Sequence, residues 1–172
     1  MKRIITLSLA ALLVMGMGVT AFAAEPTSSK LPEWLPEDAP EPDPNSEVSI
    51  VYFYINENGE TVVYDPETDP IPYSTAYGDA GTAAIYWVNK SQIYWGVTSY
   101  TGGIMVFSGD VTVSTGGYYP IVDVEFDGSA SGNIMDVTTK KGSNKATLTG
   151  AMIDAKGVSL TAPDVSSTLY VN

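Results

Sequence analysis

The chain has 172 residues, no cysteine, no histidine and a net charge of −12, from 20 acidic and 8 basic residues. Histidine-based catalytic triads, cysteine nucleophiles and metal sites built on histidine or cysteine are therefore excluded. The negative charge argues against nucleic acids and anionic membrane surfaces as partners, because both repel an acidic protein.

The first residues have the three parts of a secretory signal peptide. Lys2 and Arg3 precede the mainly apolar run 4–19, and Ala21-Phe22-Ala23 follows as a cleavage site. The apolar run is shorter than the ~20 residues that a membrane-spanning helix needs. We therefore expect residues 1–23 to be removed near Ala23, and a secreted, extracellular mature form without a membrane span. Cleavage removes two basic residues and no acid, so the net charge becomes −14.

Residues 24–47 are dominated by prolines and acidic residues. Proline favours extended conformations and like charges repel, so this composition predicts a disordered leader. Leu31, Trp34 and Leu35 are the large apolar exceptions. Two interpretations stay open for them: a docking motif for another molecule, or a segment that folds back onto the domain.

The domain is expected to begin at Val48 with the run VSIVYFYI, whose β-branched and aromatic residues favour a strand. Asn58-Gly59 then predicts a two-residue hairpin turn. That turn pairs Ile55 with Val62 and Phe53 with Tyr64. Residues 65–82, which contain three prolines, are predicted to form a long loop.

The tripeptide Ile-Tyr-Trp occurs at 85–87 and again at 93–95. A two-residue turn at Lys90-Ser91 would place Trp87 opposite Tyr94 and Tyr86 opposite Trp95. Because neighbours on a strand alternate faces, at most half of these rings can point into a core. Exposed rings stack on sugars or anchor a protein partner, so these four are the predicted ligand-binding residues. The alternative is cross-strand packing beneath the 65–82 loop.

The remainder reads as short strands separated by glycine-containing turns, a spacing typical of sandwiches and barrels. We expect residues 48–172 to form an all-β, antiparallel β-sandwich, immunoglobulin-like or jelly-roll-like, without a convincing helix. The expected strands are 104–107, 110–114, 119–126, 134–139, 146–148, 157–161 and 168–171.

Alternation places Ile121, Asp123, Glu125 and Asp127 on one face of their strand, which predicts a solvated acidic face. The alternative is that these carboxylates donate oxygens to calcium. Their spacing matches no known calcium loop, so no metal and no cofactor are expected.

Half of the lysines of the mature chain, Lys140, Lys141 and Lys145, surround the sequence Gly142-Ser143-Asn144. We interpret this segment as a solvated hairpin tip, and an anion or an acidic partner is the alternative.

These observations favour a secreted, non-enzymatic binding protein whose partner is an extracellular glycan or protein. No catalytic residue is predicted. Two alternatives stay open: a released effector-like or toxin-like oligomer, and a small glycan hydrolase that uses carboxylates.

Overall fold

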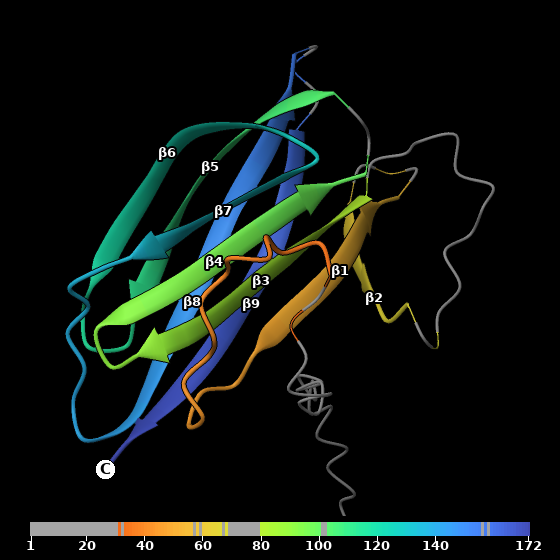
Figure 1. The fold of residues 1–172 in the computed structure, drawn as a ribbon. Helices are drawn as coiled ribbons and strands as arrows, with labels where there is room; N and C mark the ends of the chain where they lie inside the picture. The colour runs from red at the N-terminus through yellow and green to blue at the C-terminus, as the bar shows by residue number, and fades with distance from the viewer. Residues whose placement is uncertain are drawn as a thin grey trace, which may run out of the picture.

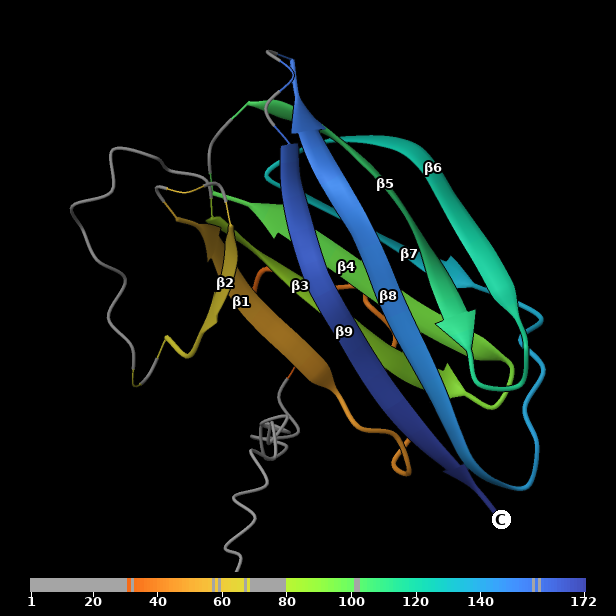
Figure 2. The ribbon, with the colours of Figure 1, turned by 180° about the vertical axis from the view of Figure 1, so that it is seen from behind.

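Two antiparallel sheets make up the computed structural model of the chain, and they pack face to face around one apolar core (Figures 1 and 2). One sheet has five strands in the order β2-β1-β3-β4-β7, and the other has four in the order β6-β5-β8-β9. This arrangement confirms the all-β prediction and is consistent with a β-sandwich. The structure describes residues 31, 33–56, 58, 60–66, 68, 80–100, 103–155, 157 and 159–172.

The described residues contain nine strands and no helix, and hence no helix long and apolar enough to cross a membrane. The predicted signal peptide lies outside the described residues. The strands are β1 (Ser49–Ile55), β2 (Thr61–Tyr64), β3 (Ala80–Asn89), β4 (Gln92–Ser99), β5 (Ile104–Val113), β6 (Tyr118–Asp127), β7 (Ser129–Ile134), β8 (Gly142–Asp154) and β9 (Ser159–Val171).

The hairpin of β1 and β2 is present, but its predicted register is wrong by one residue. Ile55 pairs with Thr61, and Phe53 pairs with Val63. The backbone N–H of Asn56 donates to the carbonyl of Glu60, so three residues lie between this hydrogen-bonded pair, whereas the predicted turn has two. A one-residue slip moves every side chain of a strand to the other face. As a result, Tyr64 lies beside Tyr52 on the outer face of the sheet.

The hairpin of β3 and β4 has the predicted two-residue turn, because Asn89 pairs with Gln92 across it. A β-bulge then shifts the register between Trp87 and Asn89. The extra residue makes Trp87 face Ile93 and Tyr86 face Tyr94, which corrects the predicted Trp87–Tyr94 and Tyr86–Trp95 pairs.

A second bulge corrects the expected acidic face of β6. Two residues, Val122 and Asp123, oppose Ser108 of β5, and Asp123 has a φ of +50°. The extra residue reverses the alternation, so Ile121 is buried in the core while Val122 is 69% exposed. Glu125 and Asp127 do face outward, as predicted.

Several strands are longer than predicted. Residues 104–113 form one continuous strand, β5, where two strands were expected around Ser108-Gly109. The segments around 146–148 and 168–171 belong to β8 and β9, which have 13 residues each. Pro163 is tolerated inside β9 because it lies in a bulge, where the register with β8 shifts between Leu148 and Gly150. Conversely, only Ile134 of the expected strand 134–139 is in a strand.

The lysine-rich segment is not a hairpin tip. Gly142 begins β8, and Lys145 lies within that strand. The amide of Asn144 is fully buried: its Oδ1 accepts from the backbone N–H of Lys140, and its Nδ2 donates to the carbonyls of Lys140 and Gly142. This amide therefore fixes the bend that leads into β8.

Candidate functional site

The four predicted ligand-binding residues lie on β3 and β4, and the structure divides them between two faces. Trp87 and Trp95 point inward, into the core between the sheets, and are 0% and 4% exposed. Tyr86 and Tyr94 point outward. They are nevertheless only 0% and 4% exposed, because another part of the chain covers them.

The two tryptophans have structural partners in the sandwich. The ring of Trp95 lies 5.4 Å from that of Phe107 on the opposite sheet, and the indole N–H of Trp87 donates to the carbonyl of Ser167 at 3.4 Å. These contacts join the five-stranded sheet to β5 and β9.

The two tyrosines form a cross-strand pair with ring centroids 5.3 Å apart and an interplanar angle of 30°. The hydroxyl of Tyr94 donates to Ser131 Oγ at 2.8 Å, and that of Tyr86 donates to the carbonyl of Pro40 at 2.8 Å. Burial raises the pKa of the Tyr86 hydroxyl above its ordinary value, and the neighbouring Tyr94 adds to the effect.

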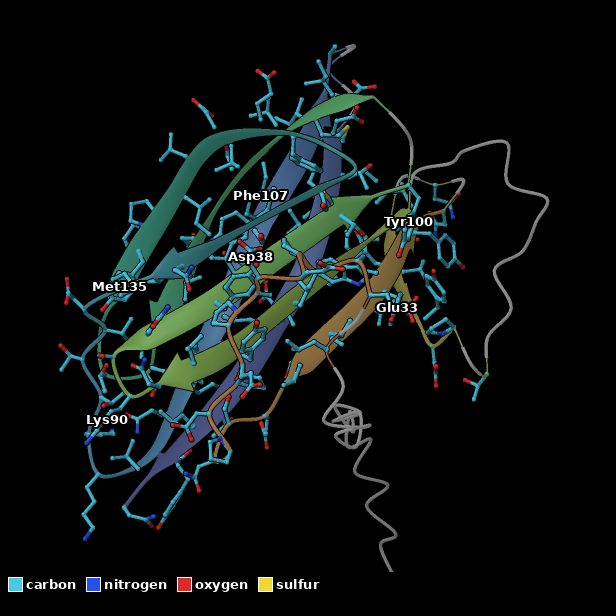
Figure 3. The ribbon with its side chains drawn as sticks, viewed as in Figure 1. Glu33, Asp38, Lys90, Tyr100, Phe107 and Met135 are labelled. Carbon is cyan, nitrogen blue, oxygen red and sulfur yellow. The ribbon has the colours of Figure 1, made fainter. Side chains whose placement is uncertain are left out.

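Residues 31 and 33–47, which we call the strap, cover this pair (Figure 1). The sequence predicted a disordered leader over 24–47. The structure instead places the strap on the sheet, as in the alternative in which Leu31, Trp34 and Leu35 fold back. Figure 3 shows Asp38 of the strap over the outer face of β4 and Glu33 beside β1. Residues 69–79 of the expected covering loop lie outside the described residues.

The strap packs where the sheet has its smallest side chains. Ala84 pairs with Gly96 on the outer face, one row away from Tyr86 and Tyr94. A Cβ atom on Gly96 would lie 2.9 Å from Leu35 Cδ2 and 3.0 Å from Trp34 Cζ3. The absence of a side chain at Gly96 thus makes room for the two largest apolar groups of the strap. We call the face formed by Val48, Tyr86, Val88, Tyr94 and Gly96 the strap site.

The C-terminal end of the strap joins the two sheets by hydrogen bonds. Asp43 N–H donates to the carbonyl of Trp87 at 2.8 Å, and Trp87 N–H donates to Ser46 Oγ at 3.0 Å. On the other sheet, Glu47 N–H donates to the carbonyl of Thr168 at 3.0 Å. Residues 43–47 therefore form hydrogen bonds with the C-terminal parts of both β3 and β9.

A second aromatic group, which sequence reasoning missed, lies farther along the same outer face. Tyr64 has ring centroids 6.0 Å from Tyr52 and 5.9 Å from Tyr54. The pKa of Tyr64 is raised by burial and by the nearby Tyr100 and Tyr52. Tyr100 follows the end of β4, is 52% exposed and lies on the side of β1 and β2 (Figure 3). We call these four residues the tyrosine cluster.

The sequence held part of the signal for this cluster. Tyr52 and Tyr54 alternate along the run VSIVYFYI and so share a face. The predicted register placed Tyr64 opposite Phe53, on the inner face, and thereby separated it from them. The register set by the Asn56–Glu60 hydrogen bond brings the tyrosines together.

The acidic residues of β6 do not converge. Asp123 accepts a hydrogen bond from Ser108 Oγ at 2.9 Å, and Glu125 and Asp127 are exposed. In the described part of the chain, no group of three or more acidic residues is arranged to hold a metal ion.

No protein-family model matches the chain, and no curated protein is similar to it at a significant level.

Proposed function

We propose that this protein is an exported, non-enzymatic binding protein that holds an extracellular glycan through the tyrosine cluster. The observation that carries this proposal is the gathering of Tyr52, Tyr54, Tyr64 and Tyr100 at one end of the outer face, with tilted ring contacts of about 6 Å. Export remains the expectation drawn from residues 1–23.

Tyrosine suits a glycan because its ring offers an apolar face and its hydroxyl can donate and accept hydrogen bonds. Sugar rings present the same combination of apolar C–H faces and hydroxyl rims. Three of the four rings come from β1 and β2, and Tyr100 directly follows β4. Strands hold side chains more rigidly than loops do. A rigid aromatic platform loses little conformational entropy when a ligand binds.

The test is calorimetric titration of the mature chain with cellohexaose, chitohexaose and xylohexaose. We expect saturable binding of at least one oligosaccharide, weakened at least about tenfold by Tyr100→Ala or Tyr54→Ala. Tyr118→Ala and Tyr170→Ala are matched controls, because both tyrosines are exposed on the four-stranded sheet and should leave binding unchanged. Absence of binding, or equal weakening by control and cluster variants, would refute the proposal. Binding only to a protein partner would replace the glycan by a protein ligand.

The other possibilities stay predictions with their own tests. Light scattering distinguishes a monomer from an effector-like or toxin-like oligomer. A glycan hydrolysis screen with single substitutions of the acidic residues tests a carboxylate hydrolase. The finer assignment of the fold, immunoglobulin-like or jelly-roll-like, also stays a prediction.

A further inference from the structure

The strap has the character of a bound peptide over most of its length. From residue 33 to residue 42, its contacts with the sheet are the apolar packing of Trp34, Leu35 and Ala39 and the hydrogen bond from Tyr86 to the carbonyl of Pro40. The backbone N–H bonds that tie it to the domain begin only at Asp43. Side chains and one carbonyl thus provide the recognition.

The strap site matches this kind of ligand. Pro36, Pro40, Pro42 and Pro44 carry no backbone N–H and have a fixed φ, so residues 36–42 offer few donors to a sheet edge and are stiff before the strap docks. Aromatic surfaces with a hydroxyl donor are the usual receptors for such proline-rich segments. Tyr86 and Tyr94 supply the rings, and Tyr86 supplies the donor.

The strap can also leave the domain without breaking a strand. It precedes β1, and all nine strands lie C-terminal to it. Trp34 Nε1 is buried without a hydrogen-bond partner, and an unsatisfied buried donor weakens docking. The segment 33–47 also carries six carboxylates and no basic residue, within a strongly acidic chain.

We propose that the strap site is a binding site for proline-rich segments with a Trp-Leu pair, and that its partner in trans is the strap of a second copy of this chain. The two copies would then exchange straps, each making in trans the contacts that the structure shows in cis. The inference is independent of the glycan proposal, since it uses only the strap and the strap site.

The intramolecular strap competes at an effective concentration in the millimolar range, so the wild-type chain should exchange only when concentrated. Two complementary full-length variants remove this competition. Gly96→Leu places a side chain where Leu35 and Trp34 dock, which blocks the site and frees the strap. The double variant Trp34→Ala/Leu35→Ala keeps the site but has a defective strap.

Each variant alone should be monomeric in sedimentation velocity, and an equimolar mixture should form a species of twice the monomer mass. Both copies carry a large negative charge and repel each other. Salt screens this repulsion, so the species of twice the monomer mass should be more abundant at high salt. The proposal would be overturned if the mixture still sediments as monomers at a protein concentration of about 1 mM, because the dissociation constant would then be weaker than about 1 mM. Far-UV circular dichroism and thermal melting verify that each variant is folded.

A labelled peptide of residues 31–47 gives a second test that does not depend on the folding of Gly96→Leu. Its fluorescence anisotropy should rise saturably with the double variant. A peptide with alanine in place of Trp34 and Leu35 should bind at least about tenfold more weakly. Equal binding of the two peptides, or no binding of either, would contradict the assignment of the site.

Discussion

Tyr86 and Tyr94 face each other on the outer side of β3 and β4, with ring centroids 5.3 Å apart, because a single bulge separates them from the turn that joins the strands. Without the bulge, each tyrosine would oppose a tryptophan. With the bulge, the two tryptophans pack in the core and the two tyrosines pack against each other under the strap.

The first prediction concerns alkaline pH. The pKa of the Tyr86 hydroxyl is raised above 10.0 in the folded chain, so above about pH 10 the unfolded chain loses this proton while the folded chain keeps it. The contribution of the protonated Tyr86 hydroxyl to the free energy of unfolding is thus fully present below about pH 10 and is lost as the pH rises further. The free energy of unfolding should fall by up to about 1.4 kcal/mol per pH unit for this group.

Urea denaturation between pH 8 and pH 11.5 measures this slope. Tyr86→Phe removes the titrating group and keeps the ring, so its stability should fall less steeply with pH than that of the wild type. Identical slopes for the two proteins would show that Tyr86 is not protected from ionisation.

The second prediction assigns Trp95 to the core. Trp95→Ala removes the ring that contacts Phe107 and leaves a cavity, which should lower the free energy of unfolding by about 3–5 kcal/mol. The matched control is Tyr118→Ala, because that ring is 64% exposed and its loss should change stability by less than about 0.5 kcal/mol. Chemical denaturation decides, and comparable effects of both substitutions would be inconsistent with the fold.

The third prediction tests the close approach of β5 and β8. A Cβ atom on Gly109 would collide with the carbonyl oxygen of Thr149 and lie 2.9 Å from the Cα of Gly150. Gly109→Ala should therefore destabilise the protein by about 1–3 kcal/mol through backbone displacement. Ala151→Ser, at the same strand pair but at a position that already carries a Cβ atom, serves as the comparison, and thermal melts of both provide the measurement. A Gly109→Ala protein as stable as the wild type would contradict this strand pairing.

The fourth prediction concerns the buried amide of Asn144. Asn144→Ala leaves the N–H of Lys140 and the carbonyls of Lys140 and Gly142 without their partner. The loss should be about 1–3 kcal/mol, measured by urea denaturation. Asn133→Ala provides the control, since Asn133 is exposed and accepts a single side-chain hydrogen bond, from Gln92. The segment before β8 should also exchange its amide hydrogens faster in Asn144→Ala, and unchanged exchange there would count against the bend.

Sequence patterns predicted the class of fold because β-branched and aromatic runs between turn residues are local signals. They also predicted the turn between β3 and β4, which depends only on the residues beside it. Registers failed wherever a bulge or a longer connection added one residue, as at Trp87–Asn89 and at Asn56–Glu60. Such an insertion is not specified by the residue types of the turn, so a local pattern misses it.

The site was predictable only in part for the same reason. The doubled Ile-Tyr-Trp motif identified the strands that carry the strap site. It did not reveal which rings face outward, or that Gly96 accommodates Trp34 and Leu35. Composition alone made residues 24–47 look unable to pack, because a proline-rich acidic segment has few apolar groups. Three such groups, Leu31, Trp34 and Leu35, are enough when a matching face exists.

The hydrogen bonds of residues 43–47 with β9 join segments that are more than 100 residues apart in the sequence. Ser46 bridges to Leu169, so the segment that precedes β1 is completed by β9. This seam stays open until β9 is free to pair. Contacts of such large sequence separation slow folding.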